Sequence, residues 1–211
     1  MSSVSANLTF FLIAVTGSAL AGYYAKKHFY DMTLVESDVD NKKYLVRNLP
    51  DKKEAANRLA EVRRRVLLLM THFKQSQTSN KIATDILKNF DAEPIRFSES
   101  APDSSYTSYT LNKGEKMYVC LRQKNETQDL VSVNVLTFVT LHELGHIGTH
   151  EIGHTPLFWN NFARILKQAE ELGIYEYQDF AAHPAEYCGI SITDQPKYKE
   201  NSMDNNKPKT Q

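Results

Sequence analysis

The sequence predicts an α+β fold in which four helices accompany a small mixed sheet of about three strands. Two patterns support this prediction. Apolar residues recur at helical spacing over residues 52–74 and again from residue 132 onwards, whereas apolar and polar residues alternate in parts of residues 95–121. The first pattern is typical of amphipathic helices and the second of half-buried strands.

The length and charge of the chain limit its organisation and partners. Its 211 residues suit one domain with appendages, and 25 basic residues balance 25 acidic ones. This balance gives no electrostatic reason to expect nucleic acid as a partner. Cys120 and Cys188 are too few for a disulfide-stapled secreted module. We expect two buried thiols, with a single disulfide as the alternative.

Residues 8–25 carry no charge and are mostly apolar. If this segment is helical, a rise of about 1.5 Å per residue gives it a length of about 27 Å, close to the thickness of a bilayer core. Lys26 and Lys27 follow directly, and positive residues favour the cytosolic side of a membrane. We therefore expect residues 1–27 to be a transmembrane anchor in a lipid bilayer. The rest of this single-pass membrane protein would lie on the cytosolic or virion-interior side.

A cleaved signal peptide is the alternative for the same segment. Ala19-Leu20-Ala21 has the small-x-small form of a cleavage site. A signal peptide needs basic residues before its apolar run, and none precedes Leu8. The anchor is therefore favoured.

The elements of the domain follow from local patterns. Residues 28–50 are mixed and polar and are predicted to be a linker to a domain over residues 51–195. An amphipathic helix over residues 52–74 opens the domain, and a shorter helix follows near residues 82–90. The alternating strands come next, with a hairpin turn at Asn112-Lys113-Gly114.

Two further helices complete the predicted domain. One runs from about Ser132 through an apolar stretch, and the other starts at Pro156, with Thr155 as its N-cap, and closes at Gly173. The three consecutive arginines from Arg63, in the first helix, are expected to form a solvated face. Residues 196–211 are almost entirely polar, which predicts a disordered tail.

The segment His142-Glu143-Leu144-Gly145-His146 has the pattern H-E-x-x-H. On a helix, residues four apart share one face, so both imidazoles could bind a single zinc ion. Zinc lowers the pKa of a bound water, and Glu143 is placed to take its proton as general base. The pattern therefore predicts one catalytic zinc and peptide-bond hydrolysis.

A catalytic zinc needs a third protein ligand. His154 is favoured, because Gly148 and Gly153 could turn the chain back towards the metal. On a straight helix His150 would lie about 12 Å along the axis from His142, too far for a shared ion. His150 and a more distant carboxylate remain alternatives, the carboxylates being Glu170, Glu171 and Glu186.

Residues 150–154 form a second H-E-x-x-H segment, in which Glu151 would be the base. Gly148 lies just before this segment, Gly153 lies within it, and Thr155-Pro156 follows it. A continuous helix is therefore not expected there, and the first copy is the predicted catalytic one.

The first motif, followed by the run from Gly153 to Trp159, resembles the WLM and SprT-like families of zinc metallopeptidases. Residues 107–122 and 186–189 resemble small membrane-anchored members encoded by large DNA viruses and some protists. The resemblance covers roughly residues 50–195. It implies a zincin-like domain with His142, His146 and His154 as ligands and Glu143 as base.

The chain departs from these families in two places. Seven residues separate His146 from His154, where WLM members have five, and Thr155 stands where SprT-like members often have glycine. Members of both families cleave proteins, including proteins crosslinked to DNA. The neutral charge and the expected anchor argue against that substrate here.

The sequence thus predicts a membrane-anchored zinc metallopeptidase acting on a protein or peptide. The substrate is expected to add a strand to an exposed sheet edge. Tyr187 is a candidate donor to the developing oxyanion, although packing against the active-site helix is its simpler role. Two alternatives remain: a non-catalytic membrane-anchored protein with a structural zinc, and a soluble SprT/WLM-like protease acting on DNA-bound proteins.

Overall fold

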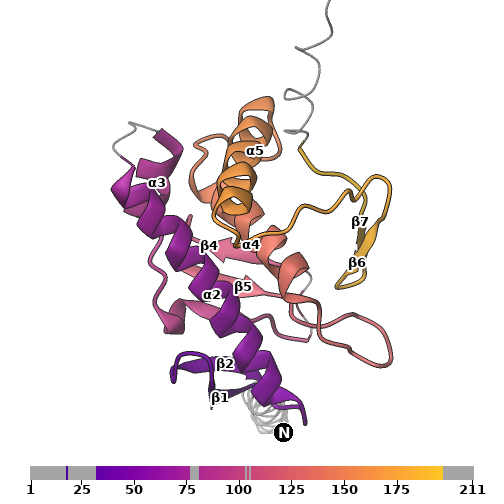
Figure 1. Cartoon of the computed structure of the whole chain (residues 1–211). Coiled ribbons are helices and arrows are strands. Elements are labelled where there is room, and N and C mark those ends of the chain that lie inside the picture. Colours follow the sequence, from indigo (N-terminus) through magenta and orange to yellow (C-terminus); the bar gives the residue numbers. More distant parts are fainter. Residues whose placement is uncertain (1–17, 19–31, 77–80, 103, 105, 197–211) are drawn as a thin grey trace, which may run out of the picture.

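The computed structural model of the chain describes residues 18, 32–76, 81–102, 104 and 106–196 (Figure 1). The elements run in the order β1 (Met32–Glu36), β2 (Lys43–Arg47), α2 (Lys52–Gln75), α3 (Lys81–Asn89), the 3-10 turn η1 (Pro94–Arg96), β3 (Phe97–Glu99), β4 (Tyr109–Leu111), β5 (Lys116–Val119), α4 (Val133–Ile147), α5 (Pro156–Glu171), β6 (Ala185–Tyr187) and β7 (Ile190–Ile192). The predicted α+β fold is confirmed, and all four predicted helices are present.

Five strands form one mixed sheet in the order β1-β2-β3-β5-β4. The three inner strands are parallel, and each outer strand is antiparallel to its neighbour. Side chains alternate between the two faces of a strand. This alternation buries Tyr44 and Val46 of β2 and Met117 and Val119 of β5. α2 packs across the sheet against β1, β2 and β3.

Two strands of this sheet, β1 and β2, were not predicted from the sequence, and they lie within the predicted linker of residues 28–50. They pair in an antiparallel hairpin, and β2 then joins β3 in parallel. Only alternate residues of β2 enter the core, and the remaining positions of the strand include Lys43 and Arg47. The polar composition of this segment therefore concealed a sheet strand, because one buried face needs only every second residue to be apolar.

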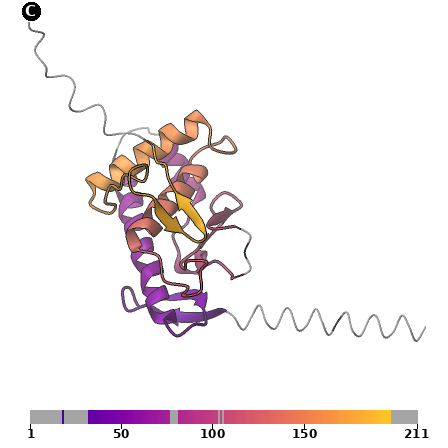
Figure 2. The ribbon, with the colours of Figure 1, turned by 90° about the vertical axis from the view of Figure 1, so that its right-hand side faces the viewer.

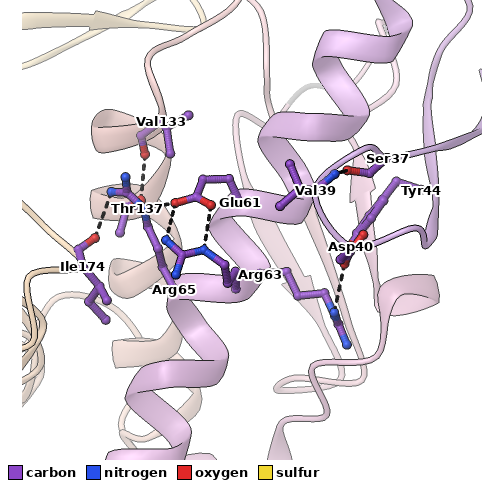
Figure 3. A network of polar contacts seen from close by, with 11 residues as sticks. Ser37, Val39, Asp40, Tyr44, Glu61, Arg63, Arg65, Val133, Thr137 and Ile174 are labelled. Atoms are coloured by element: carbon purple, nitrogen blue, oxygen red, sulfur yellow. Dashed lines mark hydrogen bonds and ion pairs between the residues drawn. The ribbon is translucent and has the colours of Figure 1, made fainter.

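Arginine side chains attach α2 to its neighbours (Figure 3). Arg63 pairs with Asp40 of the β1–β2 turn at 3.1 Å, and Arg65 donates to the Ile174 carbonyl at 2.9 Å. Of the three arginines, only Arg64 is mostly exposed. The predicted solvated face is therefore wrong for two of the three residues, which hold α2 in place.

α4 lies at the centre of the helical layer and contacts α2, α3 and α5. The β6–β7 hairpin forms a separate two-stranded sheet, which crosses in front of the helices in Figure 2. Side chains of this hairpin and of α4 line the same cavity, so the two elements face one another. The hairpin was not predicted from the sequence.

A disulfide joins Cys120, directly after β5, to Cys188, in the turn between β6 and β7. Both residues are buried. The structure therefore shows the disulfide alternative rather than the two free thiols expected from the sequence. Gln123 reinforces the same junction, because its side chain donates to the Glu186 carbonyl at 2.7 Å and accepts from the Cys188 N–H at 2.9 Å.

Within the described part of the chain, no helix is long and apolar enough to cross a membrane. α2 has 24 residues but carries charged side chains along its length, so it is unsuited to a bilayer core. This finding contradicts the predicted localisation as a single-pass membrane protein, and that prediction is withdrawn. The segment on which it rested, residues 8–25, lies outside the described residues except for Ser18, as does the predicted tail except for Pro196.

Candidate metal centre

α4 presents His142 and His146 from a helix that is buried on almost all sides. Ser132 caps its start by accepting from the Val135 N–H at 3.3 Å. The apolar run from Val135 onwards packs into the core, and a helix that is apolar all round is typical of a buried position. Both histidines are half-buried, and His142 lines the adjoining cavity.

The chain turns sharply after α4 and returns His154 to the same place. α4 ends at Ile147, and Gly148 fits there because a Cβ would lie 2.5 Å from Ile82 Cγ1 of α3. Gly153 has a φ of +83°, a conformation that side-chain-bearing residues rarely adopt. Thr155 then accepts from the Phe158 N–H and starts α5.

Three imidazole nitrogens meet at this point. The Nε2 atoms of His142 and His146 are 3.1 Å apart, those of His146 and His154 are 3.2 Å apart, and those of His154 and His142 are 3.0 Å apart. Nitrogens around one tetrahedral zinc, at bond lengths of about 2.0–2.1 Å, are separated by about 3.3 Å. The triangle therefore has nearly the dimensions of three corners of a tetrahedral coordination shell, with the fourth position open.

Aromatic rings of α5 hold the imidazoles. The Phe158 ring stacks on His146 with centroids 4.3 Å apart, and it meets His142 and His154 at 4.9 Å. Gly145 permits this approach, because a Cβ there would lie 3.1 Å from the Phe158 ring. Gly145 thus allows α5 to approach closely enough for Phe158 to pack against the three histidines.

The protonation state of two of the three histidines favours metal binding. Burial lowers the pKa of His142 to about 3, with added effects from His146 and His154, and lowers the pKa of His146 to about 4. Both imidazoles are therefore neutral at neutral pH, the form that binds metals. Three imidazole nitrogens facing one point fit zinc, whose catalytic sites commonly have three protein ligands.

Glu143 lies beside this cluster without joining it. It is 9% exposed and lines a cavity with His142 and His154. Burial raises the pKa of the Glu143 carboxyl to about 8. A divalent metal ion held by the neighbouring histidines would favour the ionised carboxylate and so oppose the effect of burial.

The second motif has a different environment. His150 is 66% exposed and lies 3.1 Å from the Asp85 carboxylate, and its Nε2 atom is 2.6 Å from Lys81 Nζ. Glu151 is exposed and lies in a bend rather than a helix. In the described part of the chain, the three-histidine cluster includes neither His150 nor any of the carboxylates considered as third ligands, Glu170, Glu171 and Glu186.

Tyr187 lies across the cavity from α4, at the end of β6. It is buried, and its hydroxyl hydrogen bonds with Ser108, whose Oγ accepts from the Cys120 N–H at 3.0 Å. Burial raises the pKa of the Tyr187 hydroxyl, and the negative charge of Glu143 adds to this effect. The hydroxyl therefore keeps its proton and can act as a hydrogen-bond donor.

Comparisons with known proteins place the chain among viral relatives. No family model matches it. It is 37% identical over 183 residues to the uncharacterized protein R325 of Acanthamoeba polyphaga mimivirus, a match that covers 86% of this chain and 91% of that protein. The chain belongs to the family of this mimivirus protein.

Shorter matches extend this family. Uncharacterized proteins 136R of Invertebrate iridescent virus 6 and 042R of Invertebrate iridescent virus 3 are 37% and 38% identical over 70 and 69 residues. Each match covers 33% of this chain, and 39% and 42% of the respective relatives. Among solved structures, Wss1 from Saccharomyces cerevisiae matches 61% of this chain and 87% of its own at 21% identity, with a TM-score of 0.44.

The structure adds residues to the site that the sequence did not reveal. Phe162 and Trp159 of α5, together with Ile190 and Ile192 of β7, line the cavity beside the histidines. The alternation Ile190-Ser-Ile192 was the only local signal for β7, and three residues are too few to distinguish a strand from a loop.

Proposed function

We propose that the chain is a zinc-dependent metallopeptidase that hydrolyses peptide bonds, as its resemblance to the WLM and SprT-like families implies. The observation that carries this proposal is the convergence of three imidazole nitrogens within 3.2 Å of one another beside a buried glutamate that is not part of the cluster. A purely structural zinc has no need of such a carboxylate or of an adjoining cavity.

His142, His146 and His154 would hold one zinc ion, which would supply a Lewis acid and an acidified water. Glu143 acts as the general base: it accepts the proton of the attacking water and passes it to the leaving amine. The low exposure of Glu143 keeps competing water away from its carboxylate. Phe158 keeps the histidine rings in place through the contacts described above.

Tyr187 is the proposed donor to the oxyanion that forms on the carbonyl. Its hydroxyl stays protonated, and the residue lines the wall opposite α4. Ser108 holds the hydroxyl through a hydrogen bond. Removing one such donor typically lowers turnover by about 10²–10³-fold. Tyr187→Phe should therefore lower turnover while leaving metal content intact.

The substrate would add a strand to the sheet at β4. The two edges of the sheet are β1 and β4. Thr107, just before β4, lines the same cavity as the histidines, whereas no residue of β1 does so. An extended peptide paired with β4 would therefore pass beside the metal centre.

The proposal is tested on the purified full chain by measuring its metal content and its hydrolysis of casein and fluorogenic peptides. We expect one zinc per chain and activity that a chelator abolishes and added zinc restores. Glu143→Gln should retain zinc and lose about 10²–10⁴-fold in turnover. The matched control is Glu151→Gln, in the second motif, which should retain full activity.

Zinc retained in both the parent chain and Glu143→Gln, with neither cleaving any of these substrates, would contradict the enzymatic role. The site would then be a structural zinc site. Absence of zinc from a correctly folded parent would contradict the metal centre itself.

A further inference from the structure

The cavity beside the histidines has a volume of about 360 Å³, at the lower end of the roughly 300–1,000 Å³ typical of ligand sites. Its walls come mainly from the consecutive helices α4 and α5 and from the β6–β7 hairpin. Six of the lining residues are apolar, namely Phe138, Val139, Trp159, Phe162, Ile190 and Ile192. Most of the wall away from the metal centre is therefore hydrophobic.

The helical side of this cavity is built into the core. Phe138 packs on Phe162 with ring centroids 5.2 Å apart, and on Phe180 at 4.7 Å. Phe162 in turn meets the His142 ring at 5.2 Å. The apolar wall therefore shares its packing with the first ligand, and it cannot shift without moving that imidazole.

The opposite side is the β6–β7 hairpin, which the Cys120–Cys188 disulfide and the Gln123 side chain hold against the main sheet. Ile190 is 50% exposed and Ile192 is half-buried. Large apolar side chains at a cavity rim are unfavourable in water unless something covers them. A substrate side chain that enters between β7 and α4 would cover them.

The polar and charged residues that line the cavity disfavour a charged side chain of the substrate. None of the described residues that line the cavity is a lysine or arginine, and apart from the metal centre its charged groups are the carboxylates of Glu143 and Asp194. An acidic side chain would meet like charge. A basic one would be attracted by these carboxylates, but its ammonium or guanidinium group would lose water against the aromatic and aliphatic wall, where desolvation is costly.

We propose that this recess is a specificity subsite that takes a bulky apolar side chain, such as leucine or phenylalanine, from the residue next to the scissile bond. The proposal rests on the peptidase function proposed above. It narrows the substrate class to peptide segments with a large hydrophobic residue at the cleavage site. Such segments are exposed in unfolded or loosely folded proteins more than in folded ones.

Trp159 provides a direct probe of this subsite, because it lines the cavity and is the only tryptophan of the chain. Zinc-loaded Glu143→Gln is titrated with peptides that differ at one position, occupied by Leu, Phe, Ala, Lys or Glu, and Trp159 fluorescence is recorded. We expect the Leu and Phe peptides to bind about 10–100-fold more tightly than the Ala, Lys and Glu peptides. In the parent chain kcat/KM should follow the same order.

Two substitutions separate this subsite from general effects. Ile190→Arg places a cation at the rim and should reduce the preference for Leu while improving binding of the Glu peptide. Ile152→Arg is the matched control: Ile152 is 92% exposed and does not line the cavity, so the order of preference should not change. Metal content is measured in both variants to show that the centre is intact.

The possible results distinguish the two proposals. Selective binding of Leu and Phe peptides without cleavage by the parent would leave the subsite in place and contradict the peptidase function. Cleavage of all five peptides at equal kcat/KM, with equal binding, would overturn the subsite and leave the peptidase function in place. An identical change in preference for Ile190→Arg and Ile152→Arg would also overturn it.

Discussion

The two H-E-x-x-H segments of the chain have the same pattern and opposite surroundings. In the first, α4 buries Glu143 and places two histidines on one face, where α5 packs against them. In the second, the chain bends, Glu151 is exposed, and His150 pairs with Asp85 at the surface. His154 belongs to the second segment by sequence, yet its imidazole lies with the histidines of the first.

This contrast indicates that the geometry and protonation of an H-E-x-x-H segment depend on whether its backbone forms a buried helix. Four-residue spacing brings two imidazoles together only where the backbone is helical. A buried environment then keeps the imidazoles neutral and excludes water from the base. The second segment has neither property, and it contributes one imidazole to the histidine cluster through a turn.

The largest expected difference between the two segments concerns metal affinity. His154→Ala should weaken zinc binding at least about 100-fold, since even the outer partners of zinc ligands contribute about 10–100-fold. His150→Ala should change it less than about twofold, because this imidazole lies against Asp85. Competition with a chromophoric chelator measures both. Equal losses in the two variants would show that His150 belongs to the metal centre.

Metal removal provides the second comparison. Zinc at 100 times its dissociation constant should stabilise the folded chain by about 2.7 kcal/mol. Calorimetry with and without chelator should show this shift in the parent and in His150→Ala, and its absence in His142→Ala. A shift that persists in His142→Ala would place the metal elsewhere.

The two glycines of the turn should differ in how much an alanine substitution lowers the stability of the folded chain. Gly148→Ala forces a Cβ against Ile82 of α3, and such overpacking costs about 1–3 kcal/mol. Gly153→Ala meets no atom within 4 Å, and its cost comes only from the positive φ, about 1 kcal/mol. Urea unfolding of the metal-free proteins tests this order. A larger loss for Gly153→Ala would mean that the turn, rather than the α3–α4 contact, limits stability.

The smallest effect is expected at the surface pair of the second segment. His150→Gln removes the contact with Asp85, and exposed pairs contribute less than about 1 kcal/mol. Thermal unfolding should shift by at most a few degrees. A loss above 2 kcal/mol would indicate that this pair fixes the turn on which His154 depends.

Local signals predicted the helices of this fold well. Thr155-Pro156 marks the start of α5 because a hydroxyl at the N-cap accepts from a free backbone N–H, and that hydrogen bond is present. Gly173 closes the same helix with a φ of +66°. These features depend on neighbours in sequence, which is why they could be predicted from the sequence alone.

Long-range features could not be predicted in the same way. Nothing near Cys120 indicates that Cys188 lies beside it, and β2 joins β3 although two helices, α2 and α3, separate them in the chain. The glycines favoured His154 over His150 in the sequence, and the turn brings the His154 imidazole to the other two. That these histidines bind zinc, and that Tyr187 assists the reaction, remain predictions for experiment.

The disulfide between Cys120 and Cys188 closes a covalent ring with a sequence separation of 68 residues, and α4, the turn and α5 all lie within it. A protease that cuts the exposed turn near Ile152 would therefore produce two fragments that stay joined. All three histidines would remain on one covalently connected molecule. On a denaturing gel the two fragments would separate only after reduction. Without reduction, a cut chain would run as a single species, as the intact chain does.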